Sequence, residues 1–212
     1  MNQTTELLEV YDLKGNLLRV EERKKYYSQI KEEFAKSGKI TTKVKSVRLL
    51  LSTSEGRIYM QKRSKMKTEN AGLYDKTVGG HVTAGDSYDI TIVRECAEEL
   101  GFPVCVVAED EYNKVIKTTD TSVIGIIRKV DVIHNFLSTR KTGEGDFTQP
   151  YDTAIYIGFY DGPLHFKDGE SSGIEVMSFD EITEDLAHNP ERYTDDLMYM
   201  IKKYKTKILE GI

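Results

Sequence analysis

One helical segment, acidic along one stripe and apolar along another, limits the fold of this chain more than any other feature. It runs from Asp86 to Leu100, and Gly101 directly after it is typical of a helix C-terminus. With Glu95 as the reference and about 100° per residue, Glu98 falls near 300° and Glu99 near 40°, so the three carboxylates share one stripe. The apolar residues fall between about 140° and 220°, and they are Ile90, Val93, Ala97 and Leu100. We therefore expect the helix to pack on a sheet with its acidic stripe turned outward.

The acidic stripe has two interpretations. Like charges three and four residues apart repel by a few tenths of a kcal/mol on an isolated helix, so the stripe needs either free solvation or a cation. Solvated acidic faces are common on helices. The segment from Gly79 to Asp86, however, contains three glycines, which let the backbone approach a ligand and free a carbonyl to coordinate a hard cation. This segment favours a metal site.

Strand-like and helical segments surround this helix. Leu7–Tyr11 and Leu17–Val20 flank a turn and predict a peripheral hairpin, and the spacing of apolar residues predicts a helix over Glu21–Lys36. Further strands are expected at Val44–Leu51, Arg57–Arg63, Leu73–Val82, Val104–Val107, Val115–Lys117, Val130–Leu137, Ala154–Tyr160 and Glu175–Phe179, and closing helices at Asp180–Ala187 and Arg192–Leu209. This order predicts an α/β fold, a mixed sheet between helical layers, with residues 1–40 as an N-terminal extension and 41–212 as the main domain.

Composition excludes several classes of protein. A chain of 212 residues with 39% hydrophobic and 31% charged residues can build one domain with a substantial core. The net charge of −5 argues against non-specific binding to nucleic acid or to an anionic membrane. Cys96 and Cys105 are too few for a disulfide framework and form no C-x-x-C pair for zinc or redox chemistry. The start shows no basic stretch before an apolar one, and no apolar run reaches roughly 20 residues, so a cytoplasmic protein is expected.

The helix and the loop before it together resemble the Nudix box, the pattern G-x5-E-x7-R-E-U-x-E-E-x-G-U of that family. Here the pattern runs from Gly80 to Phe102 with the spacing matched throughout. One position departs, because the family's first glutamate is Asp86 in this chain; that residue usually supports the loop or the box arginine. The order of strands and helices over about residues 44–210 also fits the family's α/β/α sandwich. The resemblance therefore implies a Nudix-type fold with an added hairpin and helix.

The resemblance also implies a role for each box residue. Glu95, Glu98 and Glu99 would hold one or more Mg²⁺ ions and serve as catalytic residues. The Gly80 carbonyl would be a further metal ligand, and Arg94 would orient Glu95. Oxygen ligands suit Mg²⁺, for which Mn²⁺ can substitute, and a metal bridging phosphate oxygens polarises phosphorus for attack by water.

The segment before the box resembles the Nudix branch that includes isopentenyl-diphosphate isomerase. The likeness rests on Gln61-Lys-Arg-Ser-Lys-Met-Lys67, Gly72-Leu-Tyr-Asp75 and Gly80-His81-Val82. It implies that Arg63 and Lys67 bind the diphosphate of the substrate, as two cations of one loop can do. A solvated basic loop is the alternative interpretation.

Two features of the isomerase have no counterpart in this chain. Its catalytic cysteine falls at Gly79, which has no side chain. Its other metal-binding histidines would lie between Ile40 and Leu51, where this chain has none. Isomerase activity is therefore disfavoured. His81 matches a metal-binding histidine of that branch and is placed here with the substrate-binding residues, with metal coordination or a structural hydrogen bond as alternatives.

A catalytic acid outside the box is found in several family members. The candidates here are Glu144, Asp146, Asp152 and Glu175. The first two lie in the polar, glycine-containing segment Thr139–Tyr151, which we expect to be a mobile loop near a site. Simple solvation of that loop is the competing interpretation.

The sequence as a whole predicts a Mg²⁺-dependent Nudix hydrolase that cleaves the diphosphate linkage of a nucleoside diphosphate derivative or a related small diphosphate. One alternative is a Nudix-fold sensor that binds a nucleotide-like ligand without turnover, and a second is an enzyme like the isomerase. The expected partner is a small-molecule diphosphate, with neither nucleic acid nor membrane, and a homodimer is left open.

Overall fold

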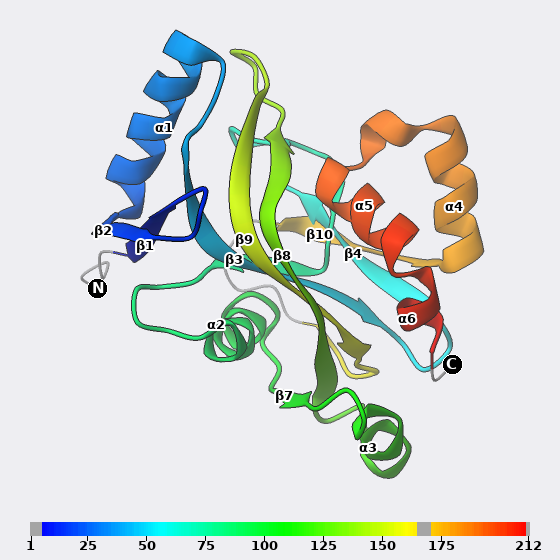
Figure 1. The fold of residues 1–212 in the computed structure, drawn as a ribbon. Helices are drawn as coiled ribbons and strands as arrows, with labels where there is room; N and C mark the ends of the chain where they lie inside the picture. Colours follow the sequence, from blue (N-terminus) through cyan, green and yellow to red (C-terminus); the bar gives the residue numbers. More distant parts are fainter. Residues whose placement is uncertain (1–5, 165–170, 211–212) are drawn as a thin grey trace.

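The computed structural model describes residues 6–164 and 171–210 and contains one mixed sheet of ten strands within these ranges (Figure 1). Six strands form its main path: β3 (Thr42–Ser52), β4 (Arg57–Arg63), β7 (Val104–Val107), β8 (Gly125–Arg140), β9 (Phe147–Phe159) and β10 (Ser171–Ser178). Their order in space is β10, β4, β3, β9, β8, β7. The pairs β3–β9 and β7–β8 are parallel and the other neighbours on this path are antiparallel, which makes the sheet mixed as predicted.

Helices cover both faces of this sheet. They are α2 (Tyr88–Glu95) with a π-helical turn (Cys96–Leu100) on one side, and α4 (Phe179–His188), α5 (Asp195–Lys203) and α6 (Lys205–Leu209) on the other (Figure 1). Alternate residues of β3 divide between the two layers, because successive side chains of a strand point to opposite faces. Leu49 packs in one core cluster with Ile92 of α2, and Leu50 packs in another with Leu197 of α5. The predicted α/β/α sandwich is confirmed.

The N-terminal hairpin and helix are present, but the hairpin is not peripheral. It consists of β1 (Leu7–Asp12) and β2 (Leu17–Glu22), and α1 (Arg23–Ser37) follows. β1 pairs with β3, so the hairpin extends the main sheet. Leu8 and Val10 of β1 are fully buried in a cluster that includes residues of α1. The extension therefore has a core cluster of its own, which it shares with Val44 of β3 and with Phe147 and Tyr151 of β9.

Two predicted strands differ from the structure. The stretch Leu73–Val82 forms two short strands, β5 (Tyr74–Asp75) on β4 and β6 (Val78–His81) on β3, because the chain changes its partner between them. The stretch Val115–Lys117 is not a strand but belongs to the helix α3 (Tyr112–Thr118). Its apolar side chains pack with Tyr112 and neighbouring strands in one cluster. A short apolar run does not by itself distinguish a strand from a helix.

The predicted loop Thr139–Tyr151 is mostly strand. β8 and β9 pair up to Arg140↔Phe147, which leaves residues 141–146 as the turn of a long hairpin. The predicted closing helix Arg192–Leu209 is interrupted, because the Thr194 side chain caps a new helix at Asp195. Within residues 6–164 and 171–210, no helix is both long and apolar enough to cross a membrane.

Candidate active site

The loop between β6 and α2 is fixed in place by the N-terminal hairpin. The Ala84 backbone N–H donates to the Leu7 carbonyl at 2.8 Å, and Leu8 forms a bridge with Thr83. Gly85 has φ +87°, a conformation that favours glycine. The hairpin thereby sets the position from which α2 starts.

Asp86 reaches the arginine of the following helix in spite of its shorter side chain. Arg94 Nη1 donates to Asp86 Oδ2 at 2.6 Å, and Arg94 Nη2 donates to Thr83 Oγ1 at 3.1 Å. The same Nη2 lies 4.0 Å from Glu95 Oε1. Arg94 therefore ties the loop to the helix beside the first glutamate of the stripe.

The three glutamates lie on both sides of a change of helical type. Glu95 ends α2, and Glu98 and Glu99 lie in the π-helical turn, which closes with the Gly101 N–H donating to the Cys96 carbonyl at 3.1 Å. Single π-helical turns inside helices occur often at functional sites. We name Glu95, Glu98 and Glu99 the acidic wall.

The predicted orientation of this helix is wrong in part. Ile90 is 58% exposed and Val93 is 38% exposed, although both were expected to pack on the sheet. The buried face instead contains Ile92, Cys96 and Leu100. This face borders the acidic stripe rather than lying opposite to it, so the carboxylates lie at the edge of the packed surface. Nothing in the structure explains the exposure of Ile90 and Val93.

Glu95 is the most buried member of the acidic wall and packs directly on the glycine loop. A side chain at Gly80 would overlap the Glu95 carboxylate, so only glycine permits this approach. Burial raises the pKa of Glu95 to about 7, against the opposing effect of Arg94 and with a further contribution from Glu98. A carboxylate whose charged form is disfavoured in this way would be stabilised by a nearby cation.

The donor atoms of this region fit a hard divalent cation. The acidic wall offers carboxylate oxygens, and the Gly80 backbone lies against Glu95, so its carbonyl is available in the same region. In the described part of the chain, no three Asp, Glu, His or Cys side chains are already gathered closely enough to hold a metal ion. Binding would therefore need the glutamate side chains to turn toward one another.

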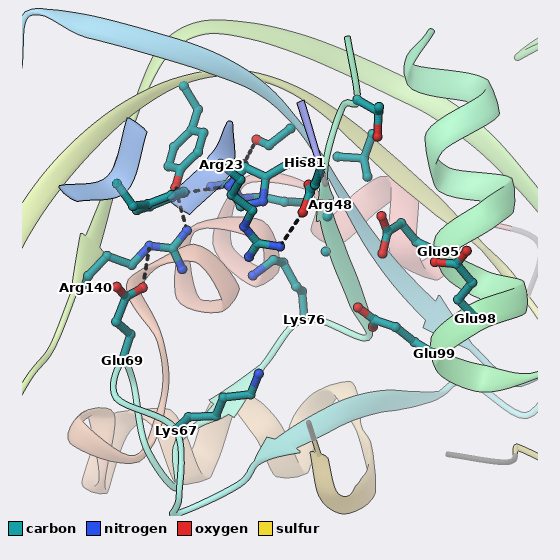
Figure 2. A pocket seen from close by; sticks show the side chains of 18 of the residues that line it. Arg23, Arg48, Lys67, Glu69, Lys76, His81, Glu95, Glu98, Glu99 and Arg140 are labelled. Carbon is teal, nitrogen blue, oxygen red and sulfur yellow. Dashed lines mark hydrogen bonds and ion pairs between the residues drawn. The ribbon is translucent and has the colours of Figure 1, made fainter. Parts of the chain in front are cut away.

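A pocket of about 1090 Å³ lies beside the acidic wall, and its lining is divided by charge. The acidic wall forms one side, while cationic side chains converge from the opposite side, together with Glu69, and from below (Figure 2). Residues of the extension also line it; they are Glu6, Glu22, Arg23, Lys24, Tyr27 and Lys31. The pocket is thus completed by a region that was predicted only as an addition to the domain.

Three buried or largely buried cations, Arg48, Lys76 and Arg140, line the inner part of the pocket; we name them the basic floor. Arg48 Nε donates to Asp196 Oδ2 at 2.9 Å. Lys76 Nζ lies 3.0 Å from Asp75 Oδ1 and 3.6 Å from Asp196 Oδ2. The three cations come from β3, from the β5–β6 connection and from β8, so the sheet brings distant segments together.

Arg63 and Lys67, the predicted diphosphate ligands, both line the pocket but differ in their contacts. Arg63 donates from Nε and Nη2 to the Glu69 carbonyl at 3.2 and 3.0 Å, and its Nη1 lies 3.3 Å from Asp75 Oδ2. Its guanidinium therefore fixes the loop that follows β4. Lys67 lies on that loop and extends toward the pocket (Figure 2).

His81 lies in a chain of hydrogen bonds that includes the extension. Its Nε2 is 2.6 Å from the Tyr27 hydroxyl, which is 2.8 Å from the Tyr151 hydroxyl. Arg140 Nη2 also donates to Tyr151 Oη at 2.8 Å. Burial, followed by the nearby cations Arg23 and Arg140, lowers the pKa of His81 well below its ordinary value. A neutral imidazole is therefore the state favoured at this place.

The acids proposed as a catalytic base outside the box lie apart from the glutamates. None of Glu144, Asp146, Asp152 and Glu175 lines this pocket. Asp146 accepts from the Thr142 N–H at the hairpin turn, and Asp152 pairs with Lys43 at 2.8 Å.

These geometric features agree with an independent comparison of the whole sequence. The sequence pattern of the NUDIX domain matches residues 42–197, which is well over half of the chain. The chain belongs to the Nudix family.

Solved Nudix structures share this fold. DR0079 from Deinococcus radiodurans has a TM-score of 0.63 and 18% sequence identity, over 93% of this chain and 98% of that chain. A MutT protein from Methanosarcina mazei has a TM-score of 0.50 and 16% identity, over 78% and 95% of the two chains. At these identities the likeness shows the Nudix fold alone.

Curated Nudix relatives are similar over different lengths. An isopentenyl-diphosphate Delta-isomerase from Serratia proteamaculans is 23% identical over 146 residues, 69% of this chain and 68% of its own. An uncharacterised Nudix hydrolase from Streptomyces coelicolor is 47% identical over 47 residues, 22% of this chain and 26% of its own. The resemblance to the isomerase branch thus extends well beyond the Nudix box.

Gly79, which stands where the isomerase has its cysteine, has the Lys76 side chain packed over it. A side chain at Gly79 would overlap the Lys76 side chain, whose Nζ would lie 3.3 Å from the added carbon. Sequence reasoning missed Lys76, Arg48, Arg140 and Tyr27 as pocket residues. Only Arg48 gave a signal, as a charged residue within the apolar run of β3.

Proposed function

We propose that this protein is a Nudix hydrolase that uses Mg²⁺, or Mn²⁺ in its place, to cleave the diphosphate linkage of a nucleoside diphosphate derivative or a related small diphosphate. The observation that carries the proposal is that the acidic wall and a set of cationic side chains face each other across the same pocket. A metal–diphosphate complex needs both kinds of group, because the cation binds carboxylates and the remaining phosphate charge binds Lys and Arg.

Glu95, Glu98 and Glu99 would hold the metal, with the Gly80 carbonyl as a further ligand. The bound metal would polarise the scissile phosphorus–oxygen bond and lower the pKa of an attacking water. Arg94 would keep the first glutamate in place through its bonds to the loop.

The remaining pocket residues would position the substrate. Lys67 would bind a phosphate oxygen, and Arg63 would act by holding the loop that carries Lys67. His81 would contribute a neutral hydrogen-bonding group held by Tyr27. The part of the substrate beyond the diphosphate would lie against α1, whose side chains close the pocket.

Similar folds support a nucleotide derivative as the substrate. The NUDIX domain of NrtR from Shewanella oneidensis, with a TM-score of 0.50, was solved with ADP ribose. A bifunctional protein from Francisella tularensis, also at 0.50, is named an NMN adenylyltransferase/ADP ribose pyrophosphatase. We therefore place ADP ribose and other nucleotide sugars first among the candidates.

The two alternatives have less support. The sensor rested on the shorter acid Asp86, which nevertheless reaches Arg94 at 2.6 Å. The isomerase would need a thiol at Gly79, where Lys76 fills the space, and a histidine free to bind metal, whereas His81 Nε2 is engaged by Tyr27.

A substrate screen tests the proposal. Nucleotide sugars, dinucleotides, nucleoside triphosphates and prenyl diphosphates would each be incubated with the protein and Mg²⁺ or Mn²⁺, and the phosphorylated products resolved by chromatography. We expect hydrolysis of at least one nucleoside diphosphate derivative and no allylic isomer from isopentenyl diphosphate. Tight binding of one compound without product from any would instead support the sensor.

A further inference from the structure

The basic floor presents its cations to the pocket, while two of the three carboxylates near it lie behind them and the third, Glu69, also lines the pocket. Arg48, Lys76 and Arg140 all line the pocket, whereas Asp75 and Asp196, their partners, are not among the described residues that do so. Both aspartates are almost fully buried. The inner surface that a ligand would meet is therefore mainly cationic, with Glu69 at its side and each cation held by a defined contact.

The charges of this cluster do not balance. Three carboxylates, which are Asp75, Asp196 and Glu69, have five cations within 4.0 Å among the described residues; these are Lys31, Arg48, Arg63, Lys76 and Arg140. Arg140 Nε is buried and makes no hydrogen bond within the described residues; its closest carboxylate oxygen there, on Glu69, is 4.0 Å away. A buried donor of this kind is costly unless a ligand or water satisfies it.

The basic floor adjoins the acidic wall through two consecutive glycines. The Lys76 side chain packs over Gly79, and the Glu95 carboxylate packs over Gly80. Successive residues of a strand point to opposite faces, so Lys76 and Glu95 approach β6 from its two faces, and both side chains line the one pocket. The absence of side chains at both glycines leaves space for this approach.

We propose that Arg48, Lys76 and Arg140 form an anion subsite for the phosphoryl group of the substrate that the metal does not hold. The inference deepens the proposed function and rests on it for the identity of the substrate. The subsite itself is built of protein cations and would bind a free phosphoryl anion without metal. Charge-assisted hydrogen bonds from two arginines and a lysine suit the oxygens of a phosphate.

Calorimetric titration with inorganic pyrophosphate, in excess EDTA, tests the subsite without any requirement for turnover. The full-length protein would be compared with Arg140→Gln and Lys76→Gln. We expect each substitution to weaken pyrophosphate binding by about tenfold or more, the scale of a lost charge-assisted hydrogen bond. Arg140→Lys, which keeps the charge, should retain most of the affinity.

Matched controls use the same substitutions outside the pocket. Lys141→Gln changes the next residue of the chain, and Lys114→Gln changes an exposed residue of α3; neither residue lines the pocket. Both should bind pyrophosphate like the unaltered protein. Lys76→Gln leaves two buried aspartates with fewer partners and can lower the melting temperature. In that case the affinity of Arg140→Gln is the one compared with the unaltered protein.

Equal affinity in all variants, or no binding of millimolar pyrophosphate to the unaltered protein, would overturn the subsite. Failure of the proposed hydrolase would look different, because pyrophosphate would still bind in EDTA and depend on Arg140 while no substrate was cleaved with Mg²⁺. The two failures can therefore be distinguished.

Discussion

The acidic wall and the basic floor line one pocket, but the pKa of Glu95 in the wall and those of Asp75 and Asp196 behind the floor are shifted in opposite directions. Burial raises the pKa of Glu95 to about 7. Burial alone would raise the pKa of Asp75 as well, but Lys76 and Arg63 outweigh burial and lower it below the ordinary value. For Asp196, Arg48 and Lys76 outweigh burial in the same way. Protein cations therefore stabilise the charged forms of Asp75 and Asp196, whereas Arg94 does not offset the burial of Glu95.

This difference separates the carboxylates that stabilise the fold from those that are available to bind a cation. Removing the carboxylate of Asp75 or Asp196 leaves buried cations of the floor with fewer partners, which lowers the free energy of unfolding. Removing one from the wall relieves repulsion between like charges and costs only what the metal would have contributed. Asp75 and Asp196 should therefore respond to substitution mainly through unfolding, and the glutamates of the wall mainly through turnover.

The largest effect is expected at Asp196, which pairs with Arg48 at 2.9 Å and is almost fully buried. Asp196→Asn should lower the free energy of unfolding by about 3–5 kcal/mol at neutral pH, as when one partner of a buried pair is removed. Because the folded pKa lies below the ordinary 3.8, this stability is present above that value and is lost as pH falls through the folded pKa. Urea unfolding at several pH values measures both quantities.

Asp180→Asn, at an exposed position on α4, is the control for that experiment. It should change unfolding by less than about 0.5 kcal/mol, as is usual for surface positions. A loss at Asp196 no larger than at Asp180 would show that the buried pair contributes nothing.

Substitutions in the acidic wall should act on turnover. Glu98→Gln or Glu99→Gln is expected to cut kcat by roughly 10²-fold or more, the scale of lost electrostatic stabilisation, while helix propensity hardly changes. The metal-free protein should be as stable as before or slightly more stable. Wild-type kcat in both variants would mean that the stripe is only a solvated surface.

Glu95→Gln should reveal the raised pKa in the metal-free protein. Below pH 4.5 the glutamate is protonated in both states; above that value the unfolded chain releases its proton first, and stability falls until the pH passes about 7. Glu95→Gln should therefore stabilise the protein by on the order of 1–2 kcal/mol at pH 8 and hardly at pH 4. Thermal unfolding in EDTA at both pH values measures this. A Glu95→Gln variant that is less stable than the unaltered protein at pH 8 would contradict the raised pKa.

The smallest effect concerns Tyr27, which links α1 to His81 at 2.6 Å. Tyr27→Phe removes the shared hydroxyl and should raise KM several-fold with little change in kcat, because the loss is about 1 kcal/mol of positioning. The neighbouring Tyr26→Phe is the matched control, since Tyr26 is buried and does not line the pocket. Equal KM changes in the two variants would remove the special role of Tyr27.

The sequence allowed the acidic wall to be predicted because its parts are close along the chain. Glu95, Glu98 and Glu99 are related by helical spacing, and the structure places all three along one pocket. The orientation of the helix was predicted only in part, because the apolar stripe placed Val93 on the sheet, whereas the structure buries Ile92 and Cys96 and leaves Val93 exposed.

The basic floor could not be predicted in the same way. Arg48 and Arg140 lie on β3 and β8, with β9 between them, so their approach depends on strand pairing that no local pattern specifies. Tyr27 was missed for a related reason, because α1 reaches the pocket only through the pairing of β1 with β3. The Arg48 side chain in an apolar strand was the one local sign of a buried polar partner.

Binding of Mn²⁺, followed by electron paramagnetic resonance at pH 8, tests most directly whether the acidic wall holds a divalent cation. The free-ion signal of Mn²⁺ should fall on addition of the full-length protein and return with excess Mg²⁺. Glu98→Gln and Glu99→Gln should bind Mn²⁺ at least tenfold more weakly, while Glu184→Gln, at an exposed position on α4, should bind it normally. Equal Mn²⁺ binding in all four proteins, or none in the unaltered protein, would contradict the metal site on which the proposed hydrolysis depends.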